Sequence, residues 1–163
     1  MKVRLAAAAI ALCLAAGIGQ ASAPPEDPIH FFEGRTESLG TVKIAMKKPF
    51  KSRAIGKGEI KPDGTLDLVQ RVEDDGRPPR NRHWKMKRIA PGRYSGTMSE
   101  AKGPVNVEEI DGRYRFRFRM EGSVSVEQWL TPARDGRSAK SNSTFRKFGI
   151  LVGRSDAVIR KLD

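Results

Sequence analysis

Arginine and aromatic side chains alternate along residues 113–120, which read Arg-Tyr-Arg-Phe-Arg-Phe-Arg-Met. Basic groups beside aromatic rings are what proteins use to hold single-stranded nucleic acid, because guanidinium groups contact phosphates while rings stack on bases. The same alternation is also compatible with a strand on a membrane surface or with one wall of a barrel. The choice among these three interpretations depends on whether the arginines and the rings lie on the same face of the strand.

The turn before this stretch indicates that they do not. Asp111-Gly112 is a favoured two-residue hairpin loop and pairs Ile110 with Arg113. Since successive side chains of a strand point to opposite faces, this register sets the rings against apolar residues and the arginines against polar ones, as with Arg115 opposite Glu108. The rings are expected to face inward and the arginines outward. We therefore expect no nucleic-acid partner.

The turn after the stretch predicts the pairing with the next strand. A two-residue Glu121-Gly122 loop would set apolar against polar side chains, so a three-residue loop, Met120-Glu121-Gly122, is favoured. This loop predicts three pairs: Phe118 with Val124, Arg115 with Glu127, and Arg113 with Trp129. Arg117 and Arg119 then remain free for a partner outside the barrel.

Inward-facing positions form a candidate ligand site. Small-molecule sites usually combine an apolar lining with a few polar groups. The predicted apolar lining is Trp84, Met86, Phe116 and Phe118, and the predicted polar groups are Arg82, Glu109, Tyr114 and Gln128. An inward carboxylate is costly unless it is hydrogen-bonded or wet, so the alternative for Glu109 is that it reaches water at a barrel mouth.

Catalytic and metal-binding patterns are weak. His30 and His83 are the only histidines, too few for a zinc site built mainly from histidine ligands. Glu108 and Glu109 are adjacent, so in a strand they point to opposite faces and do not share a substrate. No nucleophile elbow, phosphate-binding loop or dinucleotide fingerprint occurs. We expect no enzymatic activity, no metal and no cofactor.

Turn signals recur at short intervals from Phe31 onward. The glycines of seven such signals are spaced by 12, 16, 11, 9, 10 and 14 residues, a rhythm typical of consecutive antiparallel hairpins. Closing such a sheet removes its exposed edges. The prediction is an all-β domain over residues 31–163, a single antiparallel up-and-down β-barrel of lipocalin (calycin) type with about nine or ten strands. A β-sandwich is the alternative.

The N-terminus has the three-part pattern of a secretory signal peptide. Lys2 and Arg4 precede the apolar run Leu5–Ile18, and small residues follow, so residues 1–21 are expected to be removed by cleavage after Ala21. Residues 22–30 form a Pro-rich lead-in. The single cysteine, Cys13, follows a leucine and lacks the small neighbour that lipid attachment requires. The expected location is periplasmic or secreted.

The chain is strongly basic. Its 163 residues carry 31 Lys and Arg against 19 Asp and Glu, a net charge of +12, and the excess is spread from Lys47 to Lys147. A basic surface raises the local concentration of anions, so phospholipid or lipopolysaccharide headgroups are candidate partners. The alternative is a solvated surface with no specific partner.

Several short motifs occur in a characteristic order over nearly the whole chain after the signal peptide: Phe31-Phe32-Glu33-Gly34, Arg82-His83-Trp84, Gly92-Arg93-Tyr94-Ser95-Gly96-Thr97, Trp129-Leu130 and Lys147-Phe148-Gly149-Ile150-Leu151-Val152-Gly153. In these the chain resembles a bacterial envelope family known as domain of unknown function 3833. The resemblance implies a lipocalin-like barrel and no established activity. Many members are lipoproteins, from which Cys13 departs, and the family's acidic positions are only partly retained, in Met98-Ser99-Glu100 and Glu127-Gln128.

Two functions follow as hypotheses. The first is a periplasmic barrel that binds a small apolar or amphiphilic, lipid-like molecule in its interior. The alternative is a filled barrel, a non-enzymatic envelope interaction or structural protein whose basic outer face contacts anionic lipid or lipopolysaccharide. The chain is expected to act as a monomer in either case.

Overall fold

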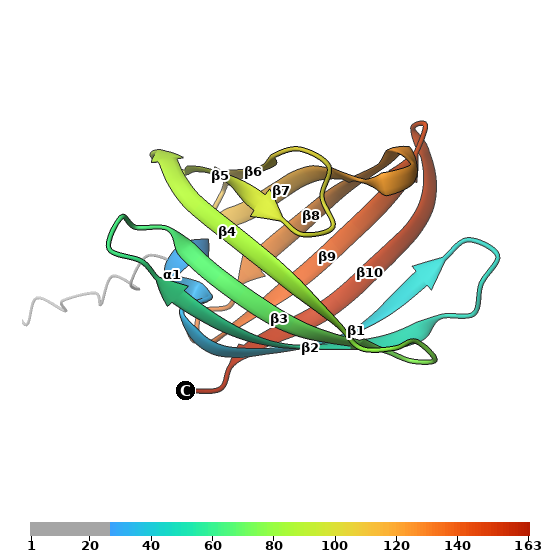
Figure 1. The fold of residues 1–163 in the computed structure, drawn as a ribbon, viewed down its shortest axis with the longest axis horizontal. Coiled ribbons are helices and arrows are strands. Elements are labelled where there is room, and N and C mark those ends of the chain that lie inside the picture. The colour runs from blue at the N-terminus through green and yellow to red at the C-terminus, as the bar shows by residue number, and fades with distance from the viewer. Residues whose placement is uncertain (1–26) are drawn as a thin grey trace, which may run out of the picture.

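Ten antiparallel strands follow one another around a closed barrel in chain order, and the last strand pairs with the first. This computed structural model describes residues 27–163, so the predicted signal peptide, its cleavage site and Cys13 lie outside the described residues. The up-and-down barrel is confirmed, and the alternative of a β-sandwich is wrong (Figure 1). Closure pairs both edges of every strand, so that no strand is left with a row of unpaired backbone N–H and C=O groups.

The elements have the following bounds: α1 (Pro28–Phe31), β1 (Gly34–Ile44), β2 (Phe50–Ile60), β3 (Leu66–Asp74), β4 (Arg80–Ala90), β5 (Arg93–Met98), β6 (Val105–Ile110), β7 (Arg113–Met120), η1 (Glu121–Ser123), β8 (Val124–Pro132), β9 (Ser138–Lys147) and β10 (Ile150–Lys161). Within residues 27–163, neither helix is long and apolar enough to cross a membrane.

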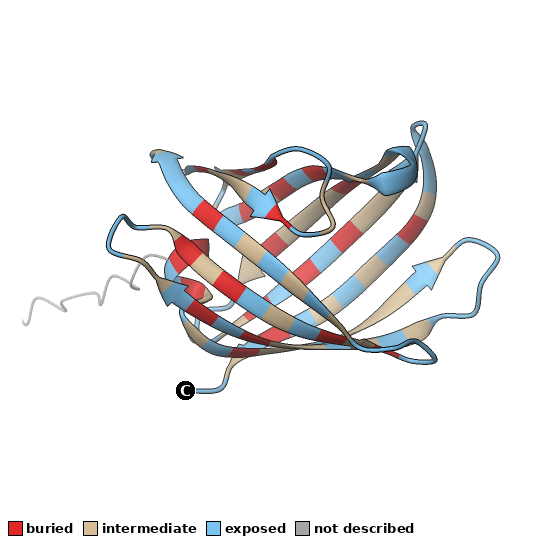
Figure 2. Ribbon diagram, viewed as in Figure 1, coloured by how far each residue is buried: buried red, intermediate tan, exposed pale blue. Residues whose placement is uncertain are grey.

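Burial alternates along the strands, as Figure 2 shows. In β7, Tyr114, Phe116 and Phe118 are buried, whereas Arg117 and Arg119 are exposed. The rings and the arginines therefore occupy opposite faces, as the sequence predicts. A polynucleotide cannot contact both sets at once.

The predicted register is confirmed on one side of β7 and wrong on the other. β6 pairs with β7 through Ile110 and Arg113, as expected from the Asp111-Gly112 turn. β8 is displaced by two residues from the prediction, so that Phe118 lies opposite Val126. The cause is η1, which uses Glu121–Ser123 as the loop and leaves Met120 in the strand. A shift of two residues preserves the faces, because the side-chain period of a strand is two.

The two ends of the barrel differ. At one end, which we call the closed end, α1 packs into the barrel, with Ile29 and Phe31 buried (Figure 1). Asp27 caps this helix, because its Oδ1 accepts a hydrogen bond of 3.0 Å from the backbone N–H of His30. The Phe31 and Phe32 rings meet edge to face, with 5.1 Å between centroids.

The opposite end, the open end, is formed by hairpin turns alone. It carries the turns between β1 and β2, β3 and β4, β5 and β6, β7 and β8, and β9 and β10. The chain leaves β10 at the closed end, so both ends of the described segment lie away from the open end (Figure 1).

Candidate functional site

The barrel encloses a cavity of about 870 Å³. It runs from Phe32 at the closed end to Lys102 and Glu121 at the open end, where it meets solvent. Small-molecule sites typically have roughly 300–1,000 Å³. The interior is therefore hollow on the scale of a ligand, which favours the first of the two functions expected from the sequence over a filled barrel.

One wall of the cavity is aromatic and thioether-rich. Trp84 and Met86 from β4 and Phe116 and Phe118 from β7 all line it, as their inward parity predicts. The Trp84 ring meets the rings of Phe116 and Phe118 edge to face, at 6.5 and 6.0 Å between centroids. The indole N–H of Trp84 donates a 2.8 Å hydrogen bond to Oε1 of Gln70. The wall is thus apolar with its one polar N–H satisfied.

The facing wall carries several small side chains among larger apolar ones such as Phe50 and Phe145. It includes Ser38, Ala54, Ser141, Ser143 and Ser155, from β1, β2, β9 and β10. Gln128 of β8 also lines the cavity, and its side-chain amide donates a 2.9 Å hydrogen bond to Oγ of Ser141. Hydroxyl groups offer a ligand both donors and acceptors along this side.

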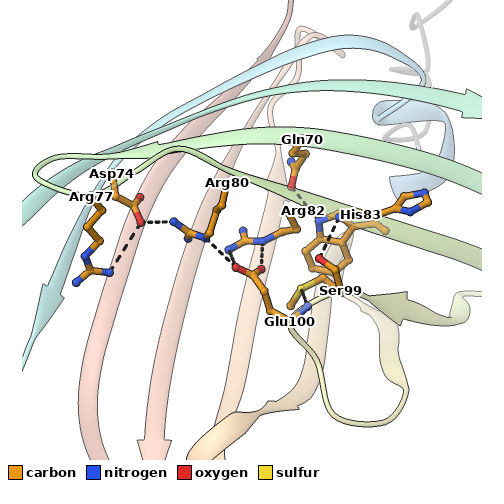
Figure 3. Close-up of polar contacts among 10 residues, drawn as sticks. Gln70, Asp74, Arg77, Arg80, Arg82, His83, Ser99 and Glu100 are labelled. Atoms are coloured by element: carbon orange, nitrogen blue, oxygen red, sulfur yellow. Dashed lines mark hydrogen bonds and ion pairs between the residues drawn. The ribbon is translucent and has the colours of Figure 1, made fainter.

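Charged residues gather where the cavity opens, and we call this group the mouth cluster: Asp74, Arg77, Arg80, Arg82 and Glu100 (Figure 3). Arg80 joins the two acids, with its Nη1 at 2.7 Å from Oδ2 of Asp74 and its Nε at 2.8 Å from Oε1 of Glu100. Arg82 contacts Glu100 through both Nε and Nη2. Arg77, in the turn between β3 and β4, lies 4.0 Å from Asp74.

The carboxylates of the mouth cluster are held ionised. Burial by itself raises the pKa of Glu100, but hydrogen bonds and charge from Arg82 and Arg80 outweigh it and leave that pKa below its ordinary value. For Asp74, burial again acts to raise the pKa, and hydrogen bonds from Ser52 and Arg80 outweigh it, so this pKa is also lowered. Three guanidinium groups and two carboxylates give the mouth cluster a net charge of +1. The mouth therefore carries one uncompensated positive charge.

The predicted polar group of Glu109, Tyr114 and Gln128 is not assembled. Tyr114 lies opposite Glu109 as expected, but the displaced β8 sets Leu130 beside Tyr114 and moves Gln128 opposite Phe116. Tyr114 is buried at the closed end, and burial raises the pKa of its phenol. Glu109 is exposed, which agrees with the alternative in which its carboxylate reaches water at one end of the barrel. Of the three, only Gln128 lines the cavity.

Outside the barrel, the arginines of β7 are largely paired. The Arg113 guanidinium lies 4.5 Å from the centre of the Trp129 ring, although Arg115 is the residue directly opposite Trp129. Arg115 and Arg117 bind the two oxygens of Glu108, at 2.7 and 3.1 Å.

Two expectations for these outer residues are therefore corrected. Arg117 is not free, and Glu127 does not pair with Arg115, because the displaced register puts it opposite Arg117. Glu127 accepts a 3.2 Å hydrogen bond from the Trp129 indole instead. Within residues 27–163, Arg119 has no ion pair.

Sequence reasoning identified Arg82 and missed the rest of the mouth cluster. Asp74 shares the inward parity of Leu68 and Val72, and Arg80 that of Arg82, so parity alone could have found both. Glu100 lies beyond the end of β5 in an irregular segment, where parity no longer applies. Among the described residues, no three His, Cys, Asp or Glu side chains are grouped to hold a metal ion.

Comparisons with known proteins agree with the barrel. A family model described as a protein of unknown function, DUF3833, matches residues 13–161. No curated protein matches the chain.

Three solved structures share the fold at low identity. The S-type phycobiliprotein lyase CPES from Guillardia theta has a TM-score of 0.67 and 8% identity, covering 83% of this chain and 90% of the lyase. Rv2717c from M. tuberculosis has a TM-score of 0.64 and 12% identity, covering 84% and 99%. A Nostoc punctiforme protein of unknown function, from the DUF3598 family, has a TM-score of 0.61 and 13% identity, covering 90% and 53%. At these identities the similarity shows the fold alone.

Proposed function

The chain belongs to the DUF3833 family of proteins of unknown function, and we propose that it binds a small amphiphilic molecule inside the barrel. The apolar part would lie against the wall formed by Trp84, Met86, Phe116 and Phe118, and an anionic end would lie at the mouth cluster. One observation carries the proposal: a cavity of about 870 Å³ has an aromatic, thioether-rich wall in its depth and a net positive charge where it opens.

The apolar part of the cavity suits a hydrocarbon chain. Burying apolar surface is favourable by about 25 cal/mol per Å², or about 0.8 kcal/mol for each methylene. The Met86 side chain is flexible and adapts to irregular shapes, and the rings of Phe116 and Phe118 offer broad apolar faces. An acyl chain is therefore the simplest occupant of this part.

The mouth cluster suits an anionic end group. Guanidinium groups bind carboxylate and phosphate oxygens through parallel hydrogen bonds that are shorter and stronger than neutral ones. Arg77 has the weakest carboxylate contact of the three arginines, because it is 47% exposed and 4.0 Å from Asp74, although its guanidinium also lies 4.4 Å from the centre of the Phe50 ring. A ligand anion would balance the single excess charge of the cluster.

We propose binding rather than catalysis. Asp74 and Glu100 have lowered pKa values because arginines hold them ionised, whereas a general acid needs a raised pKa. One protein of the same fold is a phycobiliprotein lyase, and its activity is a property of that protein. We also propose a periplasmic or secreted location, which the signal-peptide pattern of residues 1–21 supports.

Native mass spectrometry of the protein purified from its own host tests the proposal. We expect an additional mass that is released by denaturation. Ala54→Phe puts a ring into the cavity and should remove this mass, while Lys57→Phe, on the exposed face of the same strand, should retain it. If the purified protein carries nothing and palmitate added to it gives no bound species, the proposal fails.

A further inference from the structure

Two hairpin tips at the open end expose large apolar side chains to solvent. Met46, between β1 and β2, is fully exposed, and Phe148, between β9 and β10, is 79% exposed. Ile150 and Leu151, at the start of β10, are exposed as well. We call these four residues the apolar tips. Single exposed apolar residues are common, but a group at one place marks an interaction surface.

The two tips belong to neighbouring parts of the barrel. β10 pairs with both β1 and β9, and Ile44 lies opposite Gly153. The backbone N–H of Ala45 donates a 2.9 Å hydrogen bond to the carbonyl oxygen of Val152, which brings the tip of the first hairpin beside the start of β10. Both hairpins extend at the right-hand end in Figure 1, the open end of the barrel.

Neither solvent nor backbone conformation favours apolar residues at these tips. Met46 and Phe148 have φ values of 62° and 50°, in the left-handed region that bulky side chains rarely adopt. The chain has suitable residues for such positions elsewhere, as in the Asp111-Gly112 turn at the closed end. Residues that are unfavourable both to the turn and to solvation point to a role in binding.

Basic residues surround the apolar tips. The segments 43–51 and 144–154 contain seven lysines and arginines and no aspartate or glutamate. Four of these are exposed and adjoin the tips, and among the described residues they form no ion pairs: Lys47, Lys48, Arg146 and Lys147. Arg119 adds a further unpaired cation near the same end.

We propose that the apolar tips insert into the surface of a bilayer that contains anionic lipid, while the basic residues around them contact the headgroups. Apolar side chains flanked by lysine and arginine match a membrane interface, where hydrocarbon lies just below anionic groups. A second copy of this chain is a poorer occupant, because two basic ends would face one another in a molecule of net charge +12. Bound in this way, the barrel turns its open end toward the lipid. The proposal stands whether or not the cavity holds a ligand.

Vesicle cosedimentation tests the proposal with the whole chain after signal-peptide removal. We expect binding to vesicles of phosphatidylglycerol and phosphatidylcholine, little binding to phosphatidylcholine alone, and loss of binding as salt rises from 0.05 to 0.5 M, concentrations of roughly this order being enough to screen surface charges. The double variant Met46→Asn, Phe148→Asn should bind at least about tenfold more weakly. Asparagine tolerates positive φ, so this variant should fold at least as stably as the parent.

The matched control is Val69→Thr with Ile89→Thr, two exposed apolar residues away from the tips, which should leave binding unchanged. Equal vesicle binding by the asparagine variant, or equal binding to uncharged vesicles, overturns the proposal. So does a dimer in the absence of vesicles that the asparagine substitutions dissociate, because the tips would then be covered by a second copy. Phe148→Trp in a Trp129→Phe background gives a second readout: vesicles with brominated acyl chains should quench its fluorescence more than that of Trp129→Phe alone, in which Trp84 is the remaining tryptophan.

Discussion

The indole N–H of Trp84 donates a 2.8 Å hydrogen bond to Oε1 of Gln70 inside the barrel. Trp84 belongs to the aromatic wall and lies two residues from Arg82 of the mouth cluster on the inner face of β4. Trp84 is therefore held in one orientation at the junction of the charged and apolar parts of the cavity. A molecule that occupies both parts along this wall would lie beside the Trp84 ring.

Replacing Gln70 tests the importance of this hydrogen bond. Gln70→Leu keeps most of the side-chain volume but leaves the indole N–H without a partner, which should lower the free energy of unfolding by about 1–3 kcal/mol. Urea denaturation followed by circular dichroism measures the change. Arg71→Leu on the outer face of the same strand breaks only an exposed ion pair with Glu73 and should cost about 0–1 kcal/mol. Equal losses in both variants would show that the hydrogen bond to Trp84 stabilises the fold no more than an exposed ion pair does.

Removing the charge of Glu100 should strengthen the binding of an anionic amphiphile. Glu100 occupies Arg80 and Arg82, so Glu100→Gln frees their guanidinium groups for a ligand and raises the excess positive charge of the mouth cluster. We expect the dissociation constant of palmitate to fall by about tenfold, the equivalent of one charge-assisted hydrogen bond. Isothermal titration calorimetry measures it.

The control for this experiment is Glu59→Gln, at an exposed position of β2 near the closed end, which should leave palmitate affinity unchanged. An uncharged monoacylglycerol should bind Glu100→Gln and the parent with the same dissociation constant. Weaker palmitate binding by a folded Glu100→Gln protein would mean that the mouth cluster is not where the anionic end lies.

The same substitution should change how stability depends on pH. The pKa of Glu100 is lowered in the folded protein, because Arg82 and Arg80 outweigh the effect of burial. Its contribution is therefore complete above the unfolded carboxyl pKa of about 4 and is lost as pH falls through the lower folded value. At pH 7, Glu100→Gln should be about 1–3 kcal/mol less stable than the parent.

The stability difference between the two proteins should shrink steadily below about pH 4. Urea denaturation at a series of pH values from neutral to acid measures the difference. A gap that stays constant across this range would show that the ionised form of Glu100 does not stabilise the fold.

Gly58 should be required for the closed end to form. A Cβ atom at this position would lie 2.0 Å from the carbonyl oxygen of Phe32, which is backbone and cannot rotate away. Gly58→Ala should therefore displace the segment that follows α1 and lower the thermal midpoint by at least about 3 °C, the shift that a loss of roughly 1 kcal/mol gives in a domain of this size. Gly64→Ala, where an added Cβ meets nothing, is strained only by its φ of 80° and should cost less. Greater damage from Gly64→Ala would contradict this account of the closed end.

The sequence predicts the barrel well because its signals are local and repeated. Turn residues recur at short intervals, and the parity of Tyr114, Phe116 and Phe118 assigns faces without any long-range information. The Arg113–Trp129 contact was also expected, although the structure makes it between diagonal neighbours. The register of β8 could not be predicted, because both possible three-residue loops keep the faces matched and only the conformation of η1 separates them.

The candidate site was harder to predict than the fold. The aromatic wall follows from parity, but the mouth cluster depends on Glu100, which lies outside any strand and meets Arg80 and Arg82 only after β4 and β5 have paired. The closed end depends on where α1 packs, which a short turn-like sequence does not specify. The polar end of the cavity was accordingly expected near Glu109, whereas the mouth cluster lies at the opposite end.

Fluorescence of Trp84 provides the most direct test of the central claim that an amphiphile occupies the cavity. The chain has two tryptophans, and Trp129→Phe removes the one on the outer face, leaving Trp84 as the reporter. Titrating this variant with palmitate should change the Trp84 emission in a saturable way, and adding Ala54→Phe should abolish the change. An emission spectrum that does not respond to palmitate or to monoacylglycerol, in a protein shown to be folded, would contradict the proposal that the barrel interior is a binding site for such molecules.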